Sequence, residues 1–136
     1  MKDLHSQVGV LSALSPALTT ATTDTAGNAI DLQGFNSLAF VAQTGAVTTT
    51  TASISLRIQE SDTSTASDFS DAAAADLIGS NPAFTAGATS IANAVRKVGY
   101  NGAKRYARIV RTGAASATGN VGAIAVLGHP VDAPAA

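Results

Sequence analysis

The feature that most constrains the fold is the alternation of apolar and polar residues over positions 51–60. Ile54, Leu56 and Ile58 are separated by single polar residues. Successive side chains of a strand point to opposite faces, so a period of two gives one apolar and one polar face. The segment therefore predicts a half-buried β-strand.

Other segments show the same preference for strands. Residues 37–44 and 119–127 are apolar at both alternating sets of positions, which predicts strands contacted on both faces. Residues 104–112 predict a strong strand in which Arg105, Ala107, Ile109 and Arg111 share one face. Residues 30–32 and 91–99 give shorter or weaker strand signals, and residues 71–78 favour one helical turn before Gly79. We therefore expect an all-β, single-domain β-sandwich, jelly-roll-like or barrel-like.

The domain organisation predicted from these patterns has three parts. Residues 1–28 have no sustained period and are expected to form an extended N-terminal arm, residues 29–130 the β domain, and residues 131–136 a small C-terminal tail. The arm is either a frayed terminus or a segment that orders against a neighbouring subunit. The apolar arm residues expected to contact a subunit or a larger shell are Leu4, Val8, Leu11 and Leu14.

The composition excludes several kinds of chemistry. The 136 residues include no cysteine, so a disulfide scaffold, a cysteine metal site and a thiol nucleophile are excluded. The net charge of -1 argues against direct nucleic-acid binding, for which a basic surface is expected. His5 and His129 lie outside the expected strands, and the loop after Asp62 lacks the EF-hand spacing. We therefore expect no catalytic residues, no metal, no cofactor and no enzymatic activity.

Most of the cationic residues lie between positions 96 and 111. On adjacent strands they would form one basic strip, which is either a charged sheet edge that discourages aggregation or a subunit interface. The candidate contact residues in this strip are Arg96, Lys97, Arg105, Arg108 and Arg111. Only 12% of the residues are charged, and the expected core consists of small aliphatic residues. Both features favour a protein that gains stability from assembly.

The apolar runs are short. The longest near the C-terminus, residues 121–127, is far below the roughly 20 residues that a membrane-spanning helix needs. Asp3 and Gln7 interrupt the pattern of a secretory signal at the N-terminus. We therefore expect no membrane segment, no cleaved signal and an intracellular origin.

Five stretches taken together resemble a known group of proteins. They are residues 30–35 (IDLQGF), 58–62 with 68–69 (IQESD, DF), 76–79 (DLIG), 98–102 with 104–108 (VGYNG, KRYAR) and 127–130 (LGHP). Over about residues 30–130 the chain resembles small structural proteins encoded in the head-gene region of tailed bacteriophages and prophages, and among these it is most similar to capsid decoration (cement) proteins.

The resemblance implies a virion protein without enzymatic activity. Such a protein is made in the cytoplasm of the bacterial host and binds the outer surface of the capsid. There it reinforces contacts between subunits of the major capsid protein, often as a homo-oligomer, with a trimer favoured. A tail or head–tail connector protein is one alternative. A carbohydrate-binding β-sandwich, which would require exposed aromatic residues, is another.

Overall fold

The computed structural model describes residues 3–19, 22–47, 53–85, 91–114 and 119–132. Within these residues the chain is built almost entirely from β-strands, with three short 3₁₀ turns. The turns are η1 (His5–Gln7), η2 (Ala66–Asp68) and η3 (Ala74–Asp76).

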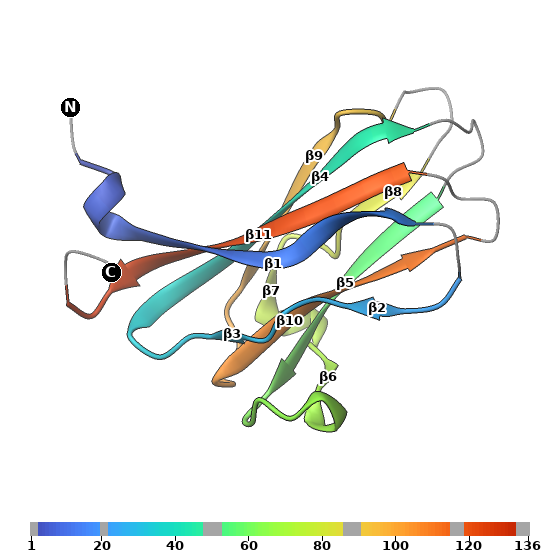
Figure 1. Ribbon diagram of the computed structural model, residues 1–136. Helices are drawn as coiled ribbons and strands as arrows, with labels where there is room; N and C mark the ends of the chain where they lie inside the picture. Colours follow the sequence, from blue (N-terminus) through green and yellow to red (C-terminus); the bar gives the residue numbers. More distant parts are fainter. Residues whose placement is uncertain (1–2, 20–21, 48–52, 86–90, 115–118, 133–136) are drawn as a thin grey trace.

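The strands form two antiparallel sheets that pack face to face (Figure 1). Sheet A has the order β1-β11-β4-β9-β7, and sheet B has β2-β10-β5-β6 with β3 beside β10 and β8 beside β5. The strands of sheet A are β1 (Val8–Thr19), β4 (Phe35–Val47), β7 (Leu77–Ile78), β9 (Val95–Tyr100) and β11 (Gly119–Pro130). The strands of sheet B are β2 (Thr25–Ala26), β3 (Ile30–Asp31), β5 (Ser53–Ser61), β6 (Ser70–Asp71), β8 (Ala83–Thr85) and β10 (Tyr106–Gly113).

The alternation over residues 51–60 corresponds to a half-buried strand, β5, as predicted. Ile54, Leu56 and Ile58 of β5 are at most 2% exposed, while the residues between them face away from the core. Strand β5 pairs with β10 over all but its first residue, from Ser61 opposite Tyr106 to Ile54 opposite Gly113. Residues 51 and 52 lie outside the described part of the chain.

The core lies between the two sheets and is aliphatic. Phe40 and Phe84 are fully buried, and the rest of the core is mainly isoleucine, leucine, valine and alanine from both sheets. The all-β, single-domain sandwich expected from the sequence is therefore confirmed. Residues 74–76 form the predicted turn as a single 3₁₀ turn, which ends in β7 before Gly79.

The expected N-terminal arm is wrong over residues 8–19. This segment is strand β1, which pairs with β11 from Val8 opposite Gly128 to Thr19 opposite Gly119 (Figure 1). Its apolar residues lack a regular period because the register shifts twice, between Ser12 and Leu14 and between Leu14 and Ala17. A bulged strand does not keep the alternation by which strands are recognised in a sequence.

Both ends of the described chain emerge near each other. The turn η1 precedes β1, and Val131 and Asp132 follow β11 at the same end of the sandwich (Figure 1). Of the expected tail, residues 133–136 lie outside the described part of the chain. Among the described residues, no helix has the length and apolar character needed to cross a bilayer.

Candidate interaction surfaces

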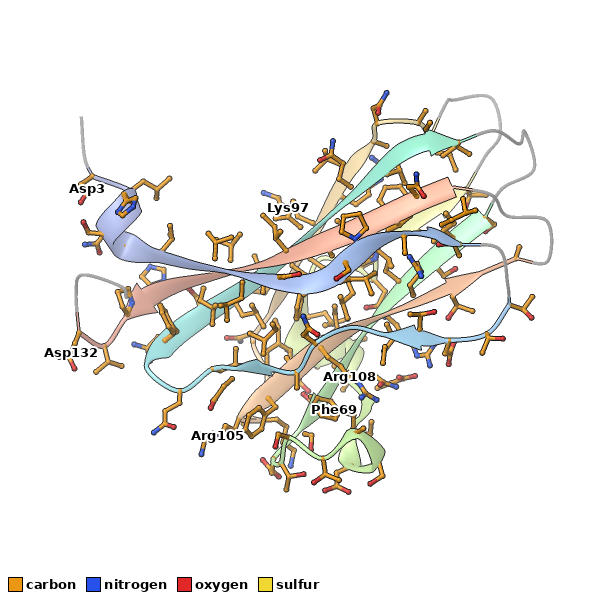
Figure 2. The ribbon with its side chains drawn as sticks, in the orientation of Figure 1. Asp3, Phe69, Lys97, Arg105, Arg108 and Asp132 are labelled. Atoms are coloured by element: carbon orange, nitrogen blue, oxygen red, sulfur yellow. The ribbon has the colours of Figure 1, made fainter. Side chains whose placement is uncertain are left out.

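The basic residues expected to form one strip are divided between the two sheets. Arg96 and Lys97 lie on β9 of sheet A, whereas Arg108 and Arg111 lie on β10 of sheet B and Arg105 directly precedes that strand. Figure 2 shows Lys97 well apart from Arg105 and Arg108. The single strip is therefore wrong, because β9 and β10 are consecutive in sequence but belong to opposite layers.

Arg111 is a buried residue and is corrected as a contact candidate. Its side chain is 5% exposed, and Nη1 donates hydrogen bonds to the carbonyl oxygens of Ala17 (2.9 Å) and Val121 (3.2 Å). Burial lowers the pKa of this guanidinium. The predicted face of residues 104–112 already placed Arg111 beside Ala107 and Ile109, both of which are fully buried. Its role is to tie β1 and β11 to sheet B.

Arg105 is exposed, but its guanidinium is already engaged within the chain. It binds both carboxylate oxygens of Asp31, at 3.1 and 2.8 Å, and Nη2 donates to Gln33 Oε1 at 2.7 Å. The Arg105 hydrogen bonds hold the pKa of Asp31 below its ordinary value. The guanidinium also lies 5.1 Å from the ring centroid of Tyr106. Arg105 thus fastens β3 to β10.

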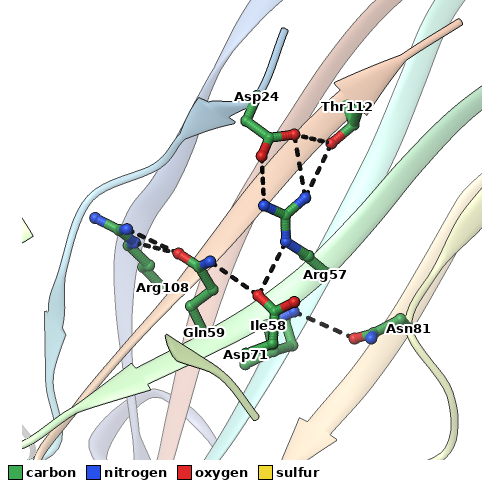
Figure 3. A network of polar contacts seen from close by, with 8 residues as sticks. All are labelled: Asp24, Arg57, Ile58, Gln59, Asp71, Asn81, Arg108 and Thr112. Carbon is green, nitrogen blue, oxygen red and sulfur yellow. Dashed lines mark hydrogen bonds and ion pairs between the residues drawn. The ribbon is translucent and has the colours of Figure 1, made fainter. Parts of the chain in front are cut away.

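Arg57 is the centre of a polar network on the outer face of sheet B, which the sequence analysis missed (Figure 3). Its Nη2 lies 2.5 Å from Asp24 Oδ2, its Nε 3.0 Å from Asp71 Oδ1, and its Nη1 donates to Thr112 at 3.1 Å. Arg57 and Thr112 lower the pKa of Asp24 to about 2. The partners are 14 to 55 residues away in sequence, so no local pattern predicts the network.

Arg108 extends this network towards Phe69. Its Nε and Nη2 donate to Gln59 Oε1, at 2.9 and 2.7 Å, and Gln59 in turn donates to Asp71 (Figure 3). The guanidinium lies 4.2 Å from the ring centroid of Phe69, and the two side chains are adjacent in Figure 2. The outer face of sheet B is thus a polar surface whose charges are largely paired within the chain.

The N-terminal candidates have different environments. Leu4, directly before η1, is 69% exposed and Leu11, on the edge strand β1, is 47% exposed, so both are accessible to a partner. Val8 is half-buried on β1. Leu14 is 4% exposed and belongs to the core, so it is corrected as a contact residue. The register shift beside Leu14 turns its side chain inward opposite Ala123.

The outer face of sheet A is apolar, unlike that of sheet B. Strand pairing places Val10 opposite Val126 and Ile124 opposite Val41, all on the face away from the core. Of the described strand residues on this face, Lys97 is the one with a charged side chain. We call this surface the apolar face; its apolar members are Val8, Val10, Pro16, Leu18, Ala39, Val41, Ile78, Val95, Ile124 and Val126.

A shallow hollow lies within the apolar face. It has a volume of about 380 Å³ and is lined by residues of β1, β4 and β11, including Pro16, Gln43, Gly45, Gly122 and Ile124. Gly122 makes room for the Pro16 ring in the wall of the hollow, since a Cβ there would lie 2.7 Å from Pro16 Cγ. The face therefore combines a mainly apolar sheet surface with a depression, and its uncharged polar members include Ser12, Ser37, Gln43 and Asn120.

The aromatic residues are not arranged as exposed sugar platforms. Tyr100 is 4% exposed; its hydroxyl donates to Glu60 Oε2 at 2.6 Å and accepts from the Lys104 N–H at 3.2 Å. Burial raises the pKa of Tyr100. Phe69 lies against Arg108, and Tyr106 against Arg105. This arrangement does not favour the carbohydrate-binding alternative.

The comparisons with known proteins concern the fold alone. No protein-family model matches the sequence, and no curated protein matches it either. The solved structure of PBSX exported protein XepA superposes with a TM-score of 0.57 at 15% identity, covering 97% of this chain but 40% of XepA. SPBc2 prophage-derived protein YomS gives a TM-score of 0.48 at 14% identity, covering 88% of this chain and 91% of YomS. A protein from Bacillus endospore appendages, which form disulfide-linked pili, gives 0.41 at 11% identity, covering 96% of each chain. The protein thus shares the β-sandwich of XepA, of which it spans less than half the length.

Proposed function

We propose that this protein is a structural component of a phage particle, which binds the outer surface of the capsid as a homo-oligomer and reinforces contacts between capsid subunits. The observation that carries the proposal is the apolar face of sheet A. A single chain exposes Ile78, Leu18, Val10 and Val95 there by 53 to 66%. Contiguous exposed apolar surface on a soluble protein marks an interaction site.

The resemblance of residues 30–130 to phage head-region proteins supports the same role. The fold shared with XepA provides a scaffold suited to this role but does not assign it, since one fold serves many functions. A protein that binds the closed shell better than the burst shell stabilises the closed one by mass action. The surfaces available for the shell are the exposed Leu4 and Leu11 and the basic residues Arg96 and Lys97.

Particles of a phage that encodes this chain test the proposal. We expect electron cryomicroscopy to locate the protein on the outside of the head, at junctions between capsomers. We also expect heads that lack it to release their DNA at a lower temperature, and the added protein to restore the original value. Density confined to the tail or portal would replace the proposal with the connector alternative. Absence from purified particles would overturn both.

A further inference from the structure

The outer side chains of the two sheets differ in how many of them find partners within the same chain. On sheet B, Arg57 and Arg108 are bound to Asp24, Asp71 and Gln59. On sheet A, the outward side chains of β1, β11 and β4 are mostly aliphatic and bind nothing in the described chain that shields them from water. A sheet with one solvated face is ordinarily polar on that face. The apolar face of sheet A therefore needs an occupant.

The part of the apolar face that a second copy can cover has the size of a small protein–protein contact. The three strands β1, β11 and β4, spaced about 4.8 Å apart with about ten residues of roughly 3.3 Å each, give roughly 500 Å². An interface of standard size buries about 800 Å² on each partner, so this contact belongs to the smaller and weaker specific interfaces.

We propose that a second copy of this chain covers the apolar face, with strand β11 of one protomer packed over β11 of the other about a twofold axis that runs along the strand. The proposal specifies the self-association that forms part of the proposed function. Two sheets packed in this way lie about 10 Å apart and form an apolar layer of the same kind as the core. Ile124, in the middle of β11, then lies on the axis opposite its own copy.

The order of the strands favours this axis. Since β1 and β4 flank β11, the axis places β1 of one protomer over β4 of the other (Figure 1). The register sets Leu18 opposite Asn120, close to the level of Gly45 on β4. Leu18, which is 57% exposed, would thus enter the hollow beside Gly45 of the second copy. A twofold interface requires such a self-complementary pairing of a projection with a depression.

The position of Lys97 fits the same arrangement. It lies on β9, two strands from β11, so the axis carries it past the edge strand β1 of the other protomer. The two ammonium groups then lie on opposite rims of the interface, where each stays in water on its flexible stem. No carboxylate of the described strands is buried on this face, so the pairing desolvates no unpaired acid.

The absence of cysteine makes a cross-linking test direct, since one introduced cysteine is the only thiol of the chain. Sheets about 10 Å apart hold the two Cα atoms beyond the reach of a disulfide, so the test uses a short bis-maleimide cross-linker. With it we expect purified Ile124→Cys to form a covalent dimer as its main product. Ser55→Cys, on the exposed outer side of sheet B, is the matched control and should stay largely uncrosslinked. Equal cross-linking of the two variants would overturn the axis.

The mass of the protein in solution gives an independent readout. We expect light scattering to show an even number of 13.4 kDa chains, in contrast to the trimer implied by the family resemblance. Ile124→Lys should raise the dissociation constant of the pair by about 100-fold or more, as for a central interface residue. Because Ile124 is 44% exposed in one chain, this variant should keep the circular dichroism and thermal transition of a folded protomer.

Failure of this inference is distinct from failure of the capsid role. An odd number of chains, or a wild-type protein that stays monomeric at tens of micromolar, overturns the pairing. A monomer whose Ile124→Lys variant loses capsid occupancy shows that the apolar face contacts the shell, so the pairing fails while the capsid role stands. A dimer that never binds particles would support the pairing and overturn the capsid role.

Discussion

Gly27 lies where the chain passes between β1 and β10, and a single methyl group there should strongly destabilise the sandwich. Its N–H donates to the Ile109 carbonyl at 2.8 Å, and the next N–H, of Asn28, donates to the Ala13 carbonyl at 2.8 Å. A Cβ at position 27 would lie 2.1 Å from the Ala13 oxygen and 2.9 Å from the Ile109 oxygen. Both obstacles are backbone atoms, so no side-chain rotation relieves the overlap.

The cost of Gly27→Ala follows from this geometry. The backbone segments must separate by about 1 Å, because Cβ contacts under 3.0 Å are essentially never seen. Two hydrogen bonds are weakened, at about 1 kcal/mol each, and overpacking adds about 1–3 kcal/mol. We therefore expect Gly27→Ala to lower the free energy of unfolding by about 3–5 kcal/mol, out of the roughly 5–15 kcal/mol typical of a domain.

Urea unfolding followed by circular dichroism measures this effect, and the midpoint should fall by roughly 2 M. Gly45→Ala is the matched control, since its Cβ would meet only Asn120 Cβ, at an ordinary 3.5 Å. Both variants are made in the Ile124→Lys background, so that pairing of protomers does not contribute, and we expect the control to change the free energy of unfolding by less than about 1 kcal/mol. Equal midpoints for the two variants would refute the reasoning from close backbone approach.

Three further substitutions have defined outcomes. Asp24→Asn should lower the thermal midpoint at pH 7. The difference from the wild type should shrink as the pH falls from 3.8 to about 2. Since Arg57 depresses the pKa of Asp24, the carboxylate contributes its full stability above pH 3.8 and loses that contribution once it is protonated below about pH 2. Tyr100→Phe removes the hydrogen bond to Glu60 and should cost about 1–3 kcal/mol in urea unfolding. Thr44→Val leaves two backbone groups of the segment before β9 without the buried hydroxyl and should also cost about 1–3 kcal/mol.

Each of these expectations has a clear contrary result. A deficit of Asp24→Asn that stays constant down to pH 2 would show that its carboxylate contributes no charge-dependent stability. A Tyr100→Phe protein as stable as the wild type would show that the buried hydroxyl is equally well solvated in the unfolded chain. For Thr44→Val, unchanged stability would mean that water replaces the hydroxyl at this site.

The sequence predicted those strands whose alternation of apolar and polar residues matches one face in the core and one face in water. The alternation of Ile54, Leu56 and Ile58 is visible because β5 has one face in the core and one in water. The faces of β10 could be assigned for the same reason, including the inward position of Arg111. What the alternation does not reveal is whether an inward arginine is a buried cross-link or a surface contact, because its carbonyl partners lie on other strands.

Strand β1 could not be predicted, since its pairing with β11 joins residues 100 to 120 positions apart and its bulges remove the period. Distance in sequence also hides the network around Arg57, whose partners come from the residue before β2, from β6 and from β10. The apolar face was equally hidden. Residues 119–127 read as a strand contacted on both sides, and the structure covers one side with sheet B and leaves Ile124 and Val126 on the other.

The pairing of β1 with β11 also governs when the molecule can fold. Strand β1 is the first strand of sheet A to be made, and its partner is the segment from Gly119 to Gly128. An emerging polypeptide therefore cannot complete sheet A until more than a hundred further residues have been synthesised. Topologies with such distant neighbours fold slowly and leave aliphatic surface unprotected in the interval. During that interval β1 has no partner strand, and its backbone N–H and C=O groups are free to pair with other strands. The nascent chain is therefore the stage at which this protein is most prone to bind chaperones and to mispair with its own copies.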